Sequence, residues 1–189
     1  MASTFTRRLV PAVLLTGAMT ATLIAALQTA AHADVLDVSC IPPSSTTTTY
    51  EPPLTTTAQQ VTVSSNTEFG PCVSATVAGL TAGRRTALSV RTMSCADLLT
   101  SSTVQYDVTW IIDGVEGASS TLLVNTVTTI VGGVAQQTQT GTVVDGLFEG
   151  DSVLRTSQAP ATQIALCTAG LGPVSSFYTV GTLTITSIT

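Results

Sequence analysis

Alternation of apolar and polar side chains restricts the fold of this chain more than any other feature. It is clearest in residues 104–110, and it returns in residues 60–64, 88–91 and 182–186. In the clearest run the apolar positions are Val104, Tyr106, Val108 and Trp110. A period of two is typical of strands that bury one face in an antiparallel sheet. The chain is therefore predicted to be all-β.

Turn signals separate these alternating runs. Asp113-Gly114 and Gly132-Gly133 suit short hairpin turns, and Asp145-Gly146 begins a third tight bend. This spacing predicts about eight to nine strands in a sandwich or barrel, rather than βαβ units. The only helix-like piece is residues 95–99, which we expect to form one turn with Ser94 as its cap.

Three residues favour a sandwich of the immunoglobulin type. Cys95, Trp110 and Cys167 follow one another in the order found in immunoglobulin domains, and Trp110 lies on the clearest strand. Ala165 stands where those domains carry a tyrosine, two residues before the second cysteine, so the tyrosine corner is missing. We therefore expect an immunoglobulin-like antiparallel β-sandwich in the architectural sense only.

The N-terminal residues show the three zones of a secretory signal peptide. Arg7-Arg8 is followed by the uncharged apolar stretch 9–27 and by the small-x-small triplet 31–33. A retained transmembrane helix is the alternative, because the apolar stretch is nearly long enough to span a bilayer. Pro11 interrupts this stretch and no basic cluster follows it, so we predict a signal peptide over residues 1–33.

The remaining residues 34–189 have the length of one ordinary domain, which is predicted to be secreted. The early part of this domain, residues 42–58, is low in complexity and holds two Pro-Pro pairs. Such a stretch is either a mucin-like linker or an edge strand, because proline is confined to sheet edges and strand ends. We favour an edge strand over residues 46–51, held in place by the cysteines that flank it.

All four cysteines come after the predicted leader. They are Cys40, Cys72, Cys95 and Cys167. An even number in an exported chain indicates disulfide bonds, and zinc is disfavoured because no close cysteine pair and no histidine accompany them. Spacing alone leaves the connectivity open. We expect Cys40–Cys72 and Cys95–Cys167, because each bridge then stays within a contiguous half of the fold.

The supply of catalytic bases is small. His32 is the only histidine, and it lies in the predicted leader. All six basic residues are arginines, so lysine cannot replace it. Catalysis by a serine or cysteine nucleophile needs a base beside it, and the glycine-rich phosphate-binding motifs are missing as well. The chain is therefore predicted to be non-enzymatic and to need no cofactor.

Carboxylates gather in two predicted turns. Asp113 and Glu116 lie in one turn, and Asp145, Glu149 and Asp151 lie in another. Two carboxylates at a suitable separation can hydrolyse a glycosidic bond, which makes a glycoside hydrolase the distant alternative. The second group is a weak calcium candidate, since calcium prefers oxygen ligands but the spacing matches no EF-hand loop. Acidic turn residues usually face water, so no metal site is predicted.

The net charge of −5 argues against nucleic acid and anionic membranes as partners. Arg84, Arg85 and Arg91 are close in sequence, and we interpret them as parts of a solvated turn and strand. A binding or surface-structural role is left, because unpaired sheet edges suit contacts with other proteins and a cleft between sheets suits a ligand. The expected partner is an envelope or extracellular protein, or a small apolar ligand.

Five short segments follow one another after the leader. They are SCADLL, DVTW, TQTGTVVDGLFEGDSV, ALCTAGL and TLTITSIT. Together they resemble a group of secreted, β-rich, four-cysteine proteins of actinobacteria that have no assigned activity. The resemblance implies location and fold but supplies no catalytic residues. In size, compartment and disulfide count the chain also resembles the secreted chromoprotein carriers of actinobacteria, which implies a small hydrophobic-ligand carrier as an alternative function.

Overall fold

The computed structural model describes residues 35–187, which hold ten β-strands, one α-helix and one 3-10 helix. The predicted signal peptide and His32 lie outside the described residues. The strands are β1 (Val35–Cys40), β2 (Ser45–Leu54), β3 (Gln59–Phe69), β4 (Cys72–Ser74), β5 (Leu80–Met93), β6 (Ser102–Ile112), β7 (Val115–Val131), β8 (Val134–Gly146), β9 (Ser152–Pro160) and β10 (Val174–Ser187). The helices are η1 (Cys95–Leu99) and α1 (Thr162–Thr168), and neither is long and apolar enough to cross a membrane.

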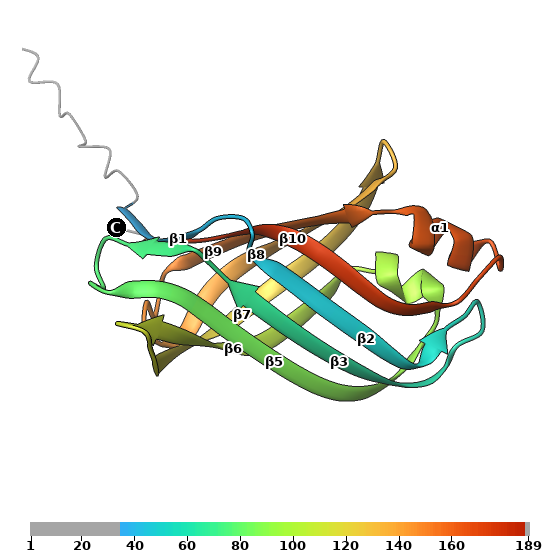
Figure 1. The fold of residues 1–189 in the computed structure, drawn as a ribbon, viewed down its shortest axis with the longest axis horizontal. Coiled ribbons are helices and arrows are strands. Elements are labelled where there is room, and N and C mark those ends of the chain that lie inside the picture. Colours follow the sequence, from blue (N-terminus) through green and yellow to red (C-terminus); the bar gives the residue numbers. More distant parts are fainter. Residues whose placement is uncertain (1–34, 188–189) are drawn as a thin grey trace, which may run out of the picture. The chain divides into compact units, whose positions relative to one another are not determined.

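All of these strands belong to one antiparallel sheet that closes on itself as a barrel (Figure 1). The ring runs β2-β3-β5-β6-β7-β8-β9-β10, and pairing of β10 with β2 completes it, with Thr179 opposite Thr46. The all-β prediction is confirmed, but the structure has this barrel in place of the expected immunoglobulin-like sandwich. Alternation shows only which side of a strand is buried, and that is the same in a sandwich and a barrel.

Two neighbouring strand positions on one side of the barrel are each filled by two shorter strands with a break between them. β1 and β2 both lie along β10, separated by residues 41–44, and β4 continues the line of β3 after Gly70-Pro71. Ser44 joins the two breaks, because its Oγ accepts a hydrogen bond of 2.8 Å from the Gly70 amide. β2 pairs with β3 on one side and with β10 on the other. The strand predicted over residues 46–51 is therefore present, but its predicted place at a sheet edge and the alternative of a linker are wrong.

Both predicted disulfides are present, one between two strands and one between the two helices. Cys40 and Cys72 are directly opposite each other on β1 and β4. Cys95 and Cys167 join η1 to α1, and the two helices lie together at one end of the barrel (Figure 1). The expected helical turn begins after Ser94, whose amide and hydroxyl both donate to the Asp97 carboxylate at 2.7 Å. We call the end of the barrel that carries η1 and α1 the cap.

Away from the cap, the interior of the barrel is apolar. Its buried core includes Phe69, Val108, Trp110, Leu122, Leu183 and Ile185. The predicted inward face of β6 is confirmed, because Tyr106, Val108 and Trp110 are all buried. Trp110 is completely buried, and its indole Nε1 donates to the Ser120 hydroxyl at 2.8 Å.

Candidate functional site

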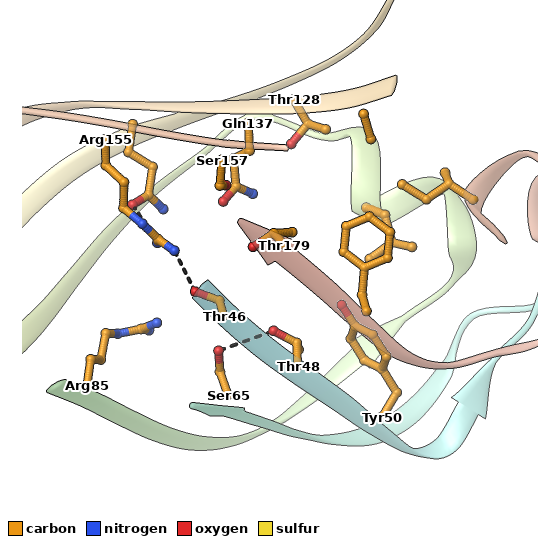
Figure 2. Close-up of a pocket in the computed structure, with 15 residues that line it drawn as sticks. Thr46, Thr48, Tyr50, Ser65, Arg85, Thr128, Gln137, Arg155, Ser157 and Thr179 are labelled. Atoms are coloured by element: carbon orange, nitrogen blue, oxygen red, sulfur yellow. Dashed lines mark hydrogen bonds between the residues drawn. The ribbon is translucent and has the colours of Figure 1, made fainter. Parts of the chain in front are cut away.

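A cavity of about 140 Å³ lies inside the barrel, between the apolar interior and the cap (Figure 2). Most of the residues that line it are polar, because neighbouring strands turn hydroxyl and amide side chains towards it. These include Thr46, Thr48, Ser65, Thr128, Gln137 and Thr179. β-Branched threonine suits the strands on which most of them lie. We call this space the barrel cavity.

Arg155 of β9 is the most deeply buried charged group in the cavity wall. Only 7% of the residue is exposed. Its Nη1 donates to Gln139 Oε1 at 3.2 Å, and its Nη2 donates to Thr46 Oγ1 at 2.6 Å. The guanidinium also lies over the Phe69 ring, 5.4 Å from the centroid. All of these partners are uncharged, so none of them neutralises the guanidinium.

Arg85 of β5 supplies a second guanidinium to the same wall. The side chain is half-buried, and its guanidinium carbon lies 4.3 Å from the centroid of the Tyr106 ring. Its Nε is buried and has no hydrogen-bond partner among the described residues. Burial is the main cause that lowers the pKa of Arg85, and the charges of Arg155 and Arg91 act in the same direction.

A hydrogen-bond network around Gln139 fixes the cavity wall beside Arg155. Tyr106 Oη donates to Gln139 Oε1 at 2.9 Å, and Gln139 Nε2 donates to Thr126 Oγ1 at 3.1 Å. Because the amide oxygen of Gln139 accepts from both Tyr106 and Arg155, its orientation is determined. The network therefore holds Arg155 in place and leaves little freedom for it to swing away from the cavity.

The end of the cavity next to the cap is largely apolar. Leu98 comes from η1, Ile164 from α1 and Phe177 from β10. Tyr50 lies there too, and burial raises its pKa to about 12, so it stays protonated near neutral pH. Figure 2 shows Arg85 and Arg155 at one end of the cavity and Tyr50 at the other. The cavity is therefore cationic at one end and apolar at the other.

An opening in the barrel wall adjoins the cavity. β5 and β6 pair only where residues 80–84 meet residues 109–112, and their ladder stops there. A hollow of about 210 Å³ lies between the unpaired parts of the two strands, with Ser89 and Arg91 on one side and Val104 on the other. We call it the β5–β6 slot. It shares wall residues with the barrel cavity, Arg85 among them, so the two spaces adjoin.

No aspartate or glutamate lines either the cavity or the slot in the part of the chain that the structure describes. The ion pairs among residues 35–187 both belong to the neighbouring Arg84, whose guanidinium lies 3.0 Å from Glu68 and 3.0 Å from Glu116 on the barrel surface. Arg85 and Arg155 therefore face the cavity as cations without an acidic partner.

The structure keeps the predicted acidic candidates away from this cavity. Within residues 35–187, no three acidic, cysteine or histidine side chains come together as a metal site would require, and the calcium candidates Asp145, Glu149 and Asp151 are not gathered into such a group. Asp151 lies beside Asp37 of β1, and desolvation, followed by repulsion from Asp37, raises the pKa of Asp151.

The other predicted carboxylate pair, Asp113 and Glu116, lies away from the cavity as well. Glu116 binds Arg84, and Asp113 lies in the β6–β7 turn with a φ of 51°. Neither residue lines the cavity. The two acids that were candidates for glycoside hydrolysis therefore do not share a groove with the site described above.

The arginines at the cavity were not predicted as site residues. Arg84 and Arg91 are exposed, as expected for a solvated turn and strand, but Arg85 turns inward between them. A signal for Arg155 was present, because it is in step with the buried Val153 and Ala159 at a spacing of two. A charged residue in the buried phase of a strand indicates a functional interior.

The fold and the cavity define a class, which is the small disulfide-bonded antiparallel β-barrel with an internal cavity. Comparison with protein-family models, curated proteins and solved structures finds no match to the chain. The functional assignment therefore depends on the geometry of the site.

Proposed function

We propose that this protein is a secreted, non-enzymatic carrier that binds a small molecule inside the barrel. The observation that supports the proposal most directly is the cavity, which lies between a packed apolar interior and a disulfide-linked cap. Small-molecule sites are typically concave and mostly pre-formed, with apolar surface and a few fixed polar groups. The barrel cavity is concave, has one apolar end, and holds fixed polar groups such as Gln139 and Arg155.

The chemistry of the cavity wall favours binding over catalysis. The wall offers hydroxyl, amide and guanidinium groups, and among residues 35–187 it is lined by no histidine, cysteine or carboxylate. General acid–base catalysis needs a group that exchanges a proton near the working pH. Tyr50, with its pKa of about 12, does not provide one. These groups can orient a ligand through hydrogen bonds without transforming it.

Two disulfides indicate an oxidising environment, because cytosolic reductants keep such thiols reduced. Together with the leader predicted for residues 1–33, they support release of the protein to the outside of the cell. A disulfide between the two helices of the cap helps such a carrier, because it keeps the helices together beside the cavity.

A test of the carrier proposal compares two adjacent threonines of β7. Thr128 lines the cavity, whereas Thr129 is exposed on the outside. Thr128→Phe fills part of the cavity, and Thr129→Phe is the matched control. We expect native mass spectrometry of the secreted wild type to show a bound small molecule, which Thr128→Phe loses and Thr129→Phe keeps. A wild-type protein that arrives without any bound mass contradicts the proposal.

A further inference from the structure

Two cationic side chains reach the barrel cavity with spare hydrogen-bonding capacity. A guanidinium has several N–H donors, and burying its charge without a counter-charge costs free energy. Arg155 is nearly fully buried among uncharged acceptors, and the Nε of Arg85 has no acceptor among the described residues. A ligand that supplies negative charge here would satisfy both groups.

Resting on the carrier function proposed above, we propose that the ligand is a small organic carboxylate. Its carboxylate lies between Arg85 and Arg155, which Figure 2 shows at the end of the cavity away from Tyr50. Its apolar body lies against Tyr50, Phe177 and the residues of the cap. Guanidinium and carboxylate form short, charge-assisted hydrogen bonds, often two at a time. An inorganic anion would satisfy the arginines but leave the apolar end of the cavity unused.

The distribution of charge over the protein favours the same class of ligand. The chain is acidic overall, with a net charge of −5, and the described carboxylates are mostly exposed on the barrel surface. The cavity and the slot nevertheless carry arginines and no acids among the described residues, and Arg91 lines the slot. An anion that enters between β5 and β6 would therefore meet cations along its path.

The size of the cavity limits the body of the ligand. An apolar cavity of roughly 150 Å³ admits benzene, and the barrel cavity is of similar size at about 140 Å³. The cavity therefore limits the ligand to about one six-membered ring, or an alkyl chain of comparable volume, with its carboxylate directed towards Arg85, which also lines the adjoining slot. Phenylacetate combines one ring with one carboxylate and is a suitable probe, and phenylacetamide is its uncharged counterpart of the same shape.

The experiment measures binding of both probes to the secreted protein by calorimetry, after removal of bound cargo by dialysis. We expect phenylacetate to bind at least tenfold more tightly than phenylacetamide. Arg85→Gln and Arg155→Gln should each weaken phenylacetate binding about ten- to a hundredfold, because each removes a charged hydrogen-bond donor. Arg84→Gln is the matched control, since Arg84 neighbours Arg85 but pairs with acids on the surface. The affinity of this variant for phenylacetate should be unchanged.

The outcomes separate the ligand class from the carrier function. Equal binding of phenylacetate and phenylacetamide overturns the carboxylate inference but leaves a carrier of neutral molecules. Equal effects of the Arg84 and Arg155 substitutions overturn it too, as does sulfate binding as tightly as phenylacetate. Native cargo that proves neutral or cationic has the same consequence. If an arginine variant fails to fold, the comparison of the two probes on the wild type still decides.

Discussion

Trp110 shows how a single buried side chain sets a requirement on its neighbour. Gly83 lies opposite it on β5, and a Cβ atom placed on Gly83 would come within 2.9 Å of two carbons of the indole ring. The indole is itself held by its hydrogen bond to Ser120 and by an edge-on contact with Phe148, so it has little room to yield. The absence of a side chain on Gly83 is therefore part of the core packing.

The first prediction concerns this contact. Gly83→Ala should lower the free energy of unfolding by about 1–3 kcal/mol, because an added methyl group overpacks the core. Gly117→Ala is the control, since no atom lies within 4 Å of the place that a Cβ atom on Gly117 would take, and its effect should stay within about 0.5 kcal/mol. Urea denaturation followed by Trp110 fluorescence measures both. Equal stability of the two variants would contradict the packing argument.

The second prediction concerns Asp151, whose folded-state pKa is raised by desolvation and by Asp37. Between the ordinary pKa and the raised one, the folded protein binds more protons at this site than the unfolded chain does. This contribution to stability is therefore present at low pH and is lost as the pH rises through the raised pKa. Asp151→Asn should remove that loss, so the variant gains stability relative to the wild type as the pH increases from about 3 to 7.

Unfolding midpoints measured across this pH range test the argument for Asp151. Asp145→Asn, at an exposed position of β8, controls for the general effect of removing one acid. A difference between Asp151→Asn and the wild type that stays constant with pH, or that shrinks as the pH rises, is incompatible with a raised pKa at Asp151.

At the scale of single residues, the sequence supported some assignments and not others. The buried face of residues 104–110 was predicted correctly because it follows from local alternation. The disulfide pairing was predicted correctly because each bridge was expected to stay within a contiguous half of the fold. Arg85 and Arg155 are distant in sequence, and only the ring of strands brings them to one cavity. Spacing along a chain does not reveal which strands become neighbours, so this pair could not be found in advance.

Among the elements, β5 departs most from what its sequence indicates. Leu88 and Val90 alternate with polar residues, yet they are 75% and 60% exposed, and Ala87 and Ser89 face the slot instead. Alternation correctly predicted a strand here, but the usual rule that the apolar side is buried fails, because the interior beside β5 is a polar cavity. The capped turn of η1 was predicted because its signals are local.

The third prediction concerns the β5–β6 slot. In an antiparallel sheet, the amides of a strand point alternately to its two neighbours. Along residues 85–93 the amides that face β3 are in a ladder, whereas those that face β6 have no ladder partner among the described residues. Hydrogen exchange measured by NMR should therefore alternate along this part of β5, with every second amide exchanging much faster than the next.

The paired part of β7 provides the internal control for the slot. Residues 122–126 of β7 are in ladders with both β6 and β8, so neighbouring amides there should be similarly protected. Uniform protection along residues 85–93 of β5 would mean that the two strands pair in solution and that the slot is closed, which would remove the proposed entry path.

On the scale of the whole barrel, the closing contact could not be predicted from sequence. It joins β2 to β10, which are separated by most of the described chain, and no local signal marks it. The strand count and the antiparallel arrangement agree with a sandwich equally well. The interior of the barrel has three zones within one ring of strands. They are an apolar core, a cationic middle and an apolar end next to the cap.

The fourth prediction concerns the seam at which this ring of strands closes. Gly181 lies where β10 passes from pairing with β2 to pairing with β1, and its amide donates to the Ser44 carbonyl at 2.9 Å. A Cβ atom on Gly181 would collide with the Thr156 carbonyl oxygen and lie 2.8 Å from the Cα of Ser157, both in the backbone of β9. Backbone cannot move aside as a flexible side chain can, so β9 and β10 would have to separate.

Gly181→Ala should therefore lower the free energy of unfolding by more than about 3 kcal/mol, and so reduce the yield of folded protein. Gly172→Ala, just before β10, has no atom within 4 Å of the added carbon and serves as the control. Because the seam adjoins the cavity through Arg155 and Thr179, surviving Gly181→Ala protein should also bind phenylacetate more weakly. A Gly181→Ala protein as stable as Gly172→Ala would show that β9 and β10 are not held this closely, and the closed ring that places Arg85 opposite Arg155 would lose its support.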